Sequence, residues 1–199
     1  MKMNLANKLT IFRMVLVPVM VIIPYLGLQG AVWGIPIAML LMEAVFVIAS
    51  ITDKLDGYIA RSRNQVTTFG KFLDPLADKI LVLAAMVLLV EANKIPAWIP
   101  TIVLAREFIV SGYRLIAVEK GGQVIAASVW GKLKTVTQMV ALILVFIDNN
   151  YFFSFVNGGL EGFALVLNVL SSVMLAISTV TTIFSGYDYL KNGKDLLKD

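Results

Sequence analysis

Six long apolar stretches, separated by short polar or glycine-containing turns, make up most of the chain. They cover residues 11–28, 35–52, 70–90, 97–118, 125–147 and 163–187. An apolar stretch of about 20 residues is long enough to cross a bilayer as a helix. The pattern predicts an all-α polytopic membrane protein of six transmembrane helices. The short polar segment 1–10 precedes them and is expected to lie at the membrane interface.

Basic residues are distributed unevenly among the turns. Apart from Lys94, every Lys and Arg lies in the N-terminal segment, the second and fourth turns, the C-terminal tail, or the half of a span that borders one of these. Basic residues favour the cytoplasmic side. The distribution predicts a multi-pass protein of the cell membrane, with both termini cytoplasmic. No repeat or composition change divides the chain, so residues 1–199 are expected to form one membrane domain.

Composition supports a membrane setting and excludes several kinds of site. The 199 residues are 59% hydrophobic and 15% charged, with a mean hydropathy of +0.85, whereas soluble domains carry about 25% charged residues. The net charge is +4, but the charged residues are distributed according to membrane side and do not form a single basic patch. No nucleic-acid partner is therefore expected. The chain has no His and no Cys, which excludes disulfides and the common nitrogen and sulfur sites for zinc or copper.

Four aspartates flank the second turn, where two apolar spans meet. Residues three or four apart share a helix face, so one face of the second helix would carry Asp53, Asp56, Gly57 and Ala60, and one face of the third helix would carry Asp74 and Asp78. Four converging carboxylates repel one another unless a cation neutralises them. An all-oxygen set suits Mg²⁺, Mn²⁺ or Ca²⁺, and four carboxylates favour a two-metal site. The alternative is that they cap helices and pair with nearby Lys and Arg.

The spacing of this stretch resembles the signature of the CDP-alcohol phosphotransferase family: D, two residues, DG, two residues, AR, eight residues, G, three residues, D, three residues, D. Its fixed positions are filled by Asp53, Asp56, Gly57, Ala60, Arg61, Gly70, Asp74 and Asp78. The resemblance implies that the four aspartates hold two divalent cations, Mg²⁺ or Mn²⁺, and that Asp78 is also a general base. It further implies that Gly57 and Ala60 admit the cytidine nucleotide and that Arg61 contacts its phosphates.

The N-terminal segment carries a second, weaker signal. Asn7 and Thr10, with Arg13 three residues further on, resemble the opening of one branch of that family, and we assign Asn7 and Thr10 to the CDP site on this basis. Helix capping is the alternative role for both residues, since Asn and Thr are favoured at helix N-termini.

Four basic residues lie within the fourth and fifth spans: Arg114, Lys132 and Lys134 near the expected cytoplasmic ends, and Arg106 deeper in the fourth span. Charges inside a span are costly unless they are paired or used. They predict a pocket for an anionic acceptor, because Arg grips phosphate with two donors at once. The alternative is that they pair with Glu107 and Glu119 or reach lipid phosphates.

The residues around these cations are similar to one group within the family, and the similarity covers the whole chain. It implies transfer of the phosphatidyl group from CDP-diacylglycerol to sn-glycerol 3-phosphate, giving phosphatidylglycerophosphate and CMP, by a protein in the lipid bilayer. By analogy with the family we also expect a homodimer. A related synthase using inositol phosphate, serine or a second lipid is the nearest rival. A divalent-cation transporter is a rival of another class.

Overall fold

The computed structural model describes residues 5–62, 68–119 and 129–193, and it divides into two compact units, Met1–Ala92 and Asn93–Asp199. The first unit contains α1 (Leu5–Ile22), η1 (Ile23–Leu26), β1 (Ala31–Val32), β2 (Ile35–Pro36), α2 (Ile37–Ser62) and α3 (Thr68–Glu91). The second contains α4 (Trp98–Glu119), α5 (Val129–Ile147), η2 (Ser154–Asn157) and α6 (Gly162–Asn192). The described part therefore has six α-helices, in the order that the apolar pattern predicts.

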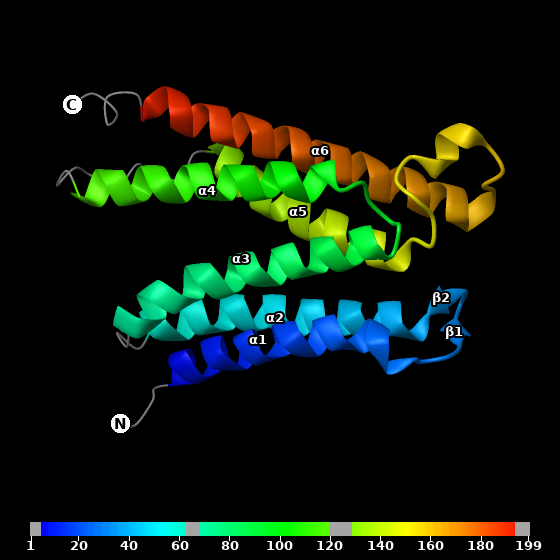
Figure 1. Ribbon diagram of the computed structural model, residues 1–199, viewed down its shortest axis with the longest axis horizontal. Helices are drawn as coiled ribbons and strands as arrows, with labels where there is room; N and C mark the ends of the chain where they lie inside the picture. The colour runs from blue at the N-terminus through cyan, green and yellow to red at the C-terminus, as the bar shows by residue number, and fades with distance from the viewer. Residues whose placement is uncertain (1–4, 63–67, 120–128, 194–199) are drawn as a thin grey trace. The chain divides into compact units, whose positions relative to one another are not determined.

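Helices α1, α2 and α3 pack lengthwise in the first unit (Figure 1). One face of α1 is buried along its length, and it changes character along the helix. Its first half contributes the polar residues Asn7, Thr10 and Arg13, and its second half contributes Val17 and Met20. The apolar half is ordinary core packing. The polar half is buried against other helices, so its side chains need polar partners within the protein.

The predicted interfacial segment is helical from Leu5 onward and runs directly into the first helix. Asn7 and Thr10 therefore lie inside α1. An N-cap residue stands just before the helix and has a non-helical backbone, so helix capping does not explain either residue.

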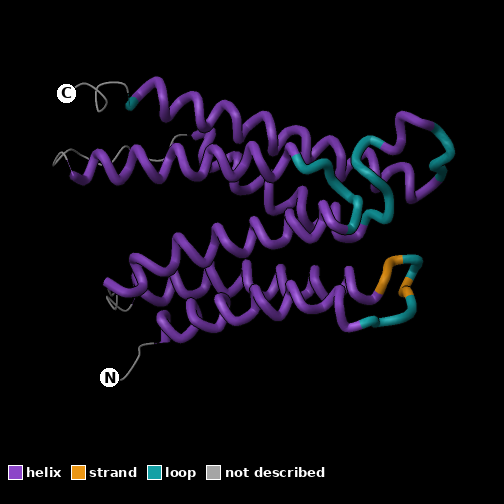
Figure 2. The backbone as a smooth tube through the Cα atoms, viewed as in Figure 1, coloured by secondary structure: helices purple, strands orange, loops and turns teal. Residues whose placement is uncertain are grey.

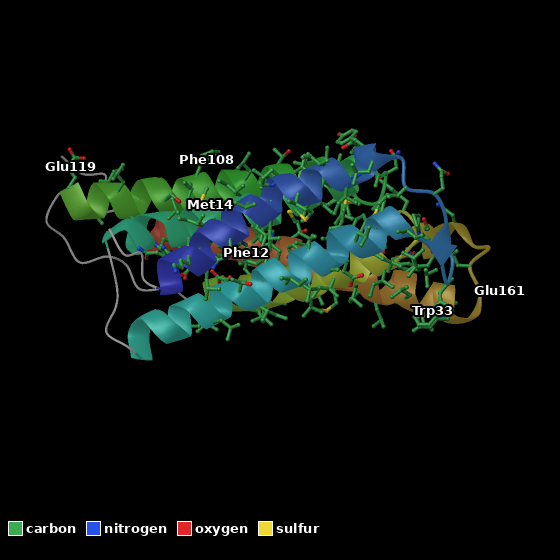
Figure 3. All side chains as sticks on the ribbon, turned by 90° about the horizontal axis from the view of Figure 1, so that it is seen from below. Phe12, Met14, Trp33, Phe108, Glu119 and Glu161 are labelled. Atoms are coloured by element: carbon green, nitrogen blue, oxygen red, sulfur yellow. The ribbon has the colours of Figure 1, made fainter. Side chains whose placement is uncertain are left out.

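The turn between the first two long helices contains a small hairpin that the apolar pattern does not predict (Figure 2). Strands β1 and β2 pair antiparallel, with Ala31 opposite Pro36 and Val32 opposite Ile35. The two residues between them, Trp33 and Gly34, have φ angles of 53° and 80°. Positive φ at both central positions is the geometry of a type I′ turn, whose twist matches that of paired strands. Trp33 is 96% exposed at the tip (Figure 3).

The second unit is organised around α6, which packs against both α4 and α5. Several small polar residues of α6 are buried, namely Ser171, Ser172, Ser178, Thr179, Thr181, Thr182 and Ser185. Some satisfy their hydroxyls on the helix itself, as Thr182 does by donating to the Ser178 carbonyl at 2.7 Å. Small residues allow helices to approach closely, which accounts for the packing of α6 against both α4 and α5.

Three described segments are long and apolar enough to cross a membrane: Asn7–Leu26, Val129–Ile147 and Gly162–Lys191. Large apolar side chains point outward from the helices, including Phe12 on α1 and Phe108 on α4 (Figure 3). Helices α2, α3 and α4 carry more charge, but they have 26, 24 and 22 residues. At 1.5 Å per residue each exceeds the roughly 30 Å of a bilayer's hydrocarbon core. Six spans remain the expectation for this chain.

Helix α3 contains a proline within its first half. It begins at Thr68, so Pro75 is the eighth residue of the helix. A proline at this depth cannot donate the usual backbone hydrogen bond to the residue four positions earlier. The helix nevertheless continues to Glu91, so the missing bond falls close to Asp74 and Asp78 without ending the helix.

Candidate functional site

The acidic motif is divided between two helices of the first unit, as the spacing predicts. The backbone of α2 continues through Asp53, Asp56, Gly57, Ala60 and Arg61, and that of α3 carries Asp74 and Asp78. Only residues 63–67 separate the two helices in the sequence. Both halves of the motif are therefore helical, and the chain between them is short.

The structure describes the side chains of only two of the four aspartates, Asp53 and Asp78, and both are partly exposed. The side chains of Asp56, Gly57, Ala60, Arg61 and Asp74 lie outside the described part. No group of three or more acidic residues is present among the described side chains. The carboxylate oxygens of Asp53 and Asp78 are nevertheless donors of the kind that Mg²⁺ and Mn²⁺ prefer. The described donor chemistry therefore fits a hard divalent cation.

Arg13 of α1 contacts the first aspartate of the motif. Its side chain is completely buried, and its Nη1 donates to Oδ1 of Asp53 at 2.5 Å. Oδ1 is thereby engaged, while Oδ2 of Asp53 has no hydrogen-bond partner in the described part. A buried guanidinium left without its carboxylate is costly. Arg13 thus fixes the orientation of Asp53 and ties α1 to the acidic motif.

Sequence reasoning placed Arg13 in the N-terminal pattern but gave it no role in the site. The signal was present in the spacing. Residues 7, 10 and 13 are three apart, so they share one face of a helix. Asn7 and Thr10 are 9% and 1% exposed and Arg13 is fully buried. The polar face of α1 therefore presents one continuous stripe to the interior of the first unit.

Three of the four predicted acceptor-binding cations come together in the second unit. Arg106 donates to Glu107 Oε1 at 2.9 Å, and Lys134 donates to the same oxygen at 2.7 Å. Arg106 also donates to Ser185 Oγ at 2.6 Å, and Arg114 donates to the Tyr189 hydroxyl at 3.0 Å. We call these six residues, from α4, α5 and α6, the arginine cluster.

The pairing with Glu107 bears out part of the alternative considered for these cations. Glu107 holds Arg106 and Lys134 through one oxygen. Arg114 contacts no carboxylate in the described part and lies against Tyr189. Lys132 is exposed on α5, and no contact in the described part joins it to the cluster. Within the contacts described, the cluster holds three cations but only one carboxylate, which pairs with two of them, and this leaves the cluster suited to an anion.

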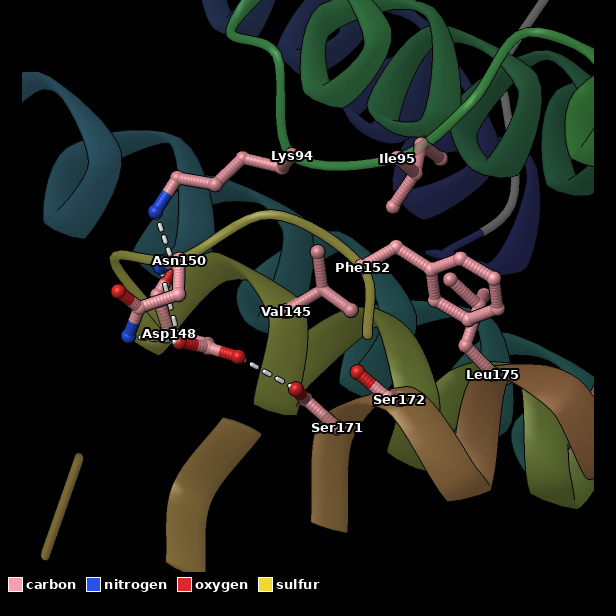
Figure 4. Close-up of a pocket in the computed structure, with 9 residues that line it drawn as sticks. All are labelled: Lys94, Ile95, Val145, Asp148, Asn150, Phe152, Ser171, Ser172 and Leu175. Atoms are coloured by element: carbon pink, nitrogen blue, oxygen red, sulfur yellow. Dashed lines mark hydrogen bonds between the residues drawn. The ribbon is translucent and has the colours of Figure 1, made fainter. Parts of the chain in front are cut away.

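A second buried polar cluster was missed by sequence reasoning. Asp148, just after α5, is 2% exposed and accepts four hydrogen bonds, from Ser171, from Asn168 and two from Asn150. Lys94 donates to the Asp148 backbone carbonyl (Figure 4). We call Lys94, Asp148, Asn150, Asn168 and Ser171 the Asp148 cluster. Its only signal in the sequence is Lys94, the one basic residue outside the expected cytoplasmic side.

Burial lowers the pKa of Lys94, and the nearby Asp148 carboxylate partly offsets that effect. The cluster also orders the segment that leads into α6. Asn168 donates to the Tyr151 carbonyl and accepts from the Phe155 amide, and Ser172 accepts from the Phe153 amide. Both side chains thus find their partners within the protein. The region is therefore a closed network that stabilises the fold.

Comparison with known proteins adds the family. The family model described as CDP-alcohol phosphatidyltransferase matches residues 3–184, which is nearly the whole chain. The chain belongs to this family. The matched region includes the acidic motif, the polar face of α1 and the three cations of the arginine cluster, whereas Ser185 and Tyr189 lie just beyond it. The protein is accordingly a transferase of phospholipid biosynthesis.

Curated relatives match over the same length. Proteins named CDP-diacylglycerol–glycerol-3-phosphate 3-phosphatidyltransferase occur at 38% identity in Bacillus subtilis and 39% in Haemophilus influenzae. The first match covers 98% of this chain and 97% of the relative, and the second covers 100% and 98%. A relative of the same name in Rickettsia bellii is 38% identical, and the match covers 94% of each chain. Several relatives of this chain thus share one enzyme name over nearly their entire length.

Proposed function

We propose that this protein transfers the phosphatidyl group from CDP-diacylglycerol to sn-glycerol 3-phosphate, giving phosphatidylglycerophosphate and CMP. The relatives named for this reaction support it, because they match nearly end to end. The convergence of Arg106, Arg114 and Lys134 in one cluster is the structural observation that favours a phosphate-bearing acceptor. An acceptor without net charge, such as serine, has less need of three clustered cations than a phosphate-bearing acceptor has.

Asp53, Asp56, Asp74 and Asp78 are the residues that would hold two divalent cations, Mg²⁺ or Mn²⁺. Cations bound there would neutralise the pyrophosphate of CDP-diacylglycerol and stabilise the departing CMP. Arg13 donates to Asp53 Oδ1, so it would hold this carboxylate in place while Asp53 binds a metal ion. Arg13 thereby sets how Asp53 takes part in the site.

Asp78 acts as the general base in the proposed reaction. It takes the proton from the 1-hydroxyl of glycerol 3-phosphate. The hydroxyl oxygen then attacks the phosphorus that carries diacylglycerol, and the bond from that phosphorus to the CMP oxygen breaks. One in-line displacement inverts the phosphorus once. A substrate with chiral phosphorus should therefore give inverted product, and retained configuration would exclude a single step.

The remaining assigned residues position the two substrates. Gly57, Ala60 and Arg61, together with Asn7 and Thr10 of α1, are proposed to bind the CDP group. Both Asn7 and Thr10 are on the buried polar face of α1, the face that also carries Arg13 to the acidic motif. Arg106, Arg114, Lys132 and Lys134 are proposed to bind the acceptor's phosphate. Lys132, being exposed, would close on the phosphate from the solvent side.

The proposed setting is the cell membrane, with six spans and with both termini and the active site on the cytoplasmic side. Basic residues concentrate on that side, in agreement with the positive-inside tendency. The fatty chains of CDP-diacylglycerol would stay in the bilayer throughout the reaction. Residues 1–199 would act as one membrane domain, and two copies would form a homodimer.

An acceptor panel tests the proposed reaction. Purified protein with CDP-diacylglycerol and Mg²⁺ or Mn²⁺ is given glycerol 3-phosphate, inositol phosphate or serine, and the product lipids are identified by mass. We expect CMP release only with glycerol 3-phosphate, and none after exhaustive chelation. Product from another acceptor would contradict the proposal, and so would CMP release without any acceptor.

Asp78→Asn tests the base. We expect turnover to fall by at least about a hundredfold, the low end for losing a general base, while CDP-diacylglycerol still binds. Glu161→Gln, an equal charge change at an exposed position just before α6, is the matched control and should leave turnover unchanged. Full turnover by Asp78→Asn would refute the assignment of Asp78.

A further inference from the structure

Tyr189 of α6 lies against both arginines of the arginine cluster. The guanidinium carbons of Arg106 and Arg114 are 5.7 Å and 5.8 Å from the centroid of its ring. Its hydroxyl accepts a hydrogen bond from Arg114 Nη2 at 3.0 Å. The residue is 2% exposed. A cation held against an aromatic ring is stabilised and loses mobility, and here one buried ring serves two cations.

Neighbouring residues of α6 complete this contact for Arg106. Ser185, one helical turn before Tyr189, accepts from Arg106 Nη2 at 2.6 Å. Gly186 lies where a Cβ atom would be 3.4 Å from Arg106 Cγ, so the glycine lets the stem of Arg106 lie directly on the helix. Residues 185, 186 and 189 share one face of α6 because they are three or four apart. This face therefore sets the position of the Arg106 side chain.

The hydroxyls of Ser185 and Tyr189 each accept from an arginine, so each keeps its own hydrogen for another acceptor. In the described part no protein acceptor takes either hydrogen. An anion held by Arg106 and Arg114 would offer its oxygens beside both hydroxyls. The same face of α6 thus holds two guanidinium groups in place and offers two further donors.

We propose that Tyr189 is a positioning residue for the acceptor's phosphate, acting through Arg106 and Arg114, with Ser185 in a supporting role. This inference rests on the proposed function, which assigns the two arginines to that phosphate. Arginine side chains lose much conformational freedom when they bind a ligand, and a site that holds them beforehand reduces this loss. Tyr189 therefore lowers the concentration of acceptor that the enzyme needs and leaves the chemical step alone.

A purely structural role is the competing explanation, because Tyr189 also packs α4 against α6. The two explanations differ in what a substitution changes. Loss of packing lowers thermal stability and reduces the amount of active enzyme, which affects both substrates alike. Loss of positioning raises the KM for the acceptor and leaves the KM for CDP-diacylglycerol and kcat unchanged.

Tyr189→Phe is the decisive variant, since it keeps the ring and removes only the hydroxyl. We expect the KM for glycerol 3-phosphate to rise about fivefold, which corresponds to the roughly 1 kcal/mol of a typical hydrogen bond. Tyr189→Leu should raise it about thirtyfold, because it also removes the ring and with it both cation–π interactions. Tyr187→Phe is the matched control, because Tyr187 is two residues away and 62% exposed. It should leave all kinetic constants unchanged.

Each result bears on a different claim. A selective rise in acceptor KM for Tyr189→Phe, at unchanged melting temperature, supports the inference. Acceptor KM equal to that of Tyr187→Phe overturns it, even if Tyr189→Leu fails to fold. A wild-type enzyme that makes no phosphatidylglycerophosphate overturns the proposed function itself, whatever the Tyr189 variants do. In that case the same variants are assayed with the acceptor that the wild-type enzyme does use. The KM for that acceptor then shows whether Tyr189 positions the arginines for a different phosphate.

Discussion

The second unit contains two charged clusters, and they differ in how their charges are balanced. In the Asp148 cluster one carboxylate accepts four hydrogen bonds from neutral groups, and one lysine lies beside it. The arginine cluster contains three cations and one carboxylate, that of Glu107, which pairs with Arg106 and Lys134, while Arg114 donates to the Tyr189 hydroxyl. The first cluster is complete as it stands. In the second cluster, as described, positive charges outnumber negative ones, and the hydroxyl groups of Ser185 and Tyr189 can each donate a hydrogen bond to an anion.

Both clusters use α6, at positions far apart along it. Asn168 and Ser171 serve the Asp148 cluster, and Ser185 and Tyr189 serve the arginine cluster. Fourteen residues separate Ser171 from Ser185, which is about 21 Å along a helix. One apolar helix thus presents polar residues near its two ends for different purposes. A satisfied network stabilises the fold, whereas a network with spare donors is suited to binding a ligand.

Removal of the central carboxylate should have the largest effect on stability. Asp148→Ala leaves four donors without their acceptor and removes the negative charge beside the buried Lys94, so we expect the free energy of unfolding to fall by about 3 kcal/mol or more. Thermal unfolding in detergent measures this loss. Folded variant protein should keep its acceptor KM, because the cluster takes no part in binding. A melting temperature equal to that of wild type would show that the network is not stabilising.

The corresponding change in the arginine cluster should spare stability and damage binding. Arg114→Ala removes a bidentate phosphate donor from a largely exposed position, and we expect the KM for glycerol 3-phosphate to rise about fiftyfold, with little change in melting temperature. Arg114→Lys keeps the positive charge but loses the paired N–H donors of the guanidinium group. The KM of this variant for glycerol 3-phosphate should therefore lie between those of wild type and Arg114→Ala. If both variants bind the acceptor normally, the cluster is structural and the contrast between the two clusters disappears.

Lys94 gives a pH test that only the Asp148 cluster should show. Its pKa is lowered in the folded state, chiefly by burial, so between that pKa and the ordinary value of 10.5 the unfolded chain binds more protons. Stability from this group therefore rises with pH across that interval. Lys94→Met should remove the rise and cost about 1 kcal/mol at neutral pH, because its hydrogen bond is removed. Unfolding measured from pH 7 upward checks both points, and an unchanged pH dependence would contradict them.

Two serines of α6 give the smallest and most closely matched test. Ser171 donates to Asp148 at 2.5 Å, and Ser185 accepts from Arg106 at 2.6 Å. Ser171→Ala should lower the free energy of unfolding by about 1 kcal/mol without kinetic effect. Ser185→Ala should raise the acceptor KM about threefold with little loss of stability. Serine-to-alanine substitution at two positions of one helix would then lower stability at one position and raise the acceptor KM at the other. If Ser171→Ala raised the KM and Ser185→Ala lowered stability, the roles assigned to the two clusters would be exchanged.

Much of the fold could be read from the sequence, because apolar segments long enough for a membrane leave few alternatives to helices. The expected spans correspond to α1 through α6, and α2 continues past its apolar part to Ser62, as expected. The hairpin at residues 31–36 was not expected, since Trp33 adopts a left-handed backbone that a tryptophan seldom takes. Pairing of β1 with β2 across this two-residue turn overrides the local preference of Trp33, whose side chain is itself exposed.

For the sites, the sequence determined which residue types stand at which spacing, and this sufficed to assign the acidic motif and its family. Local spacing fixes what shares a helix face. It cannot say which faces meet, because that depends on contacts between residues distant in the chain. Arg13 meeting Asp53 across 40 positions, Lys94 meeting Asp148 across 54, and Arg114 meeting Tyr189 across 75 were therefore decided by tertiary structure alone.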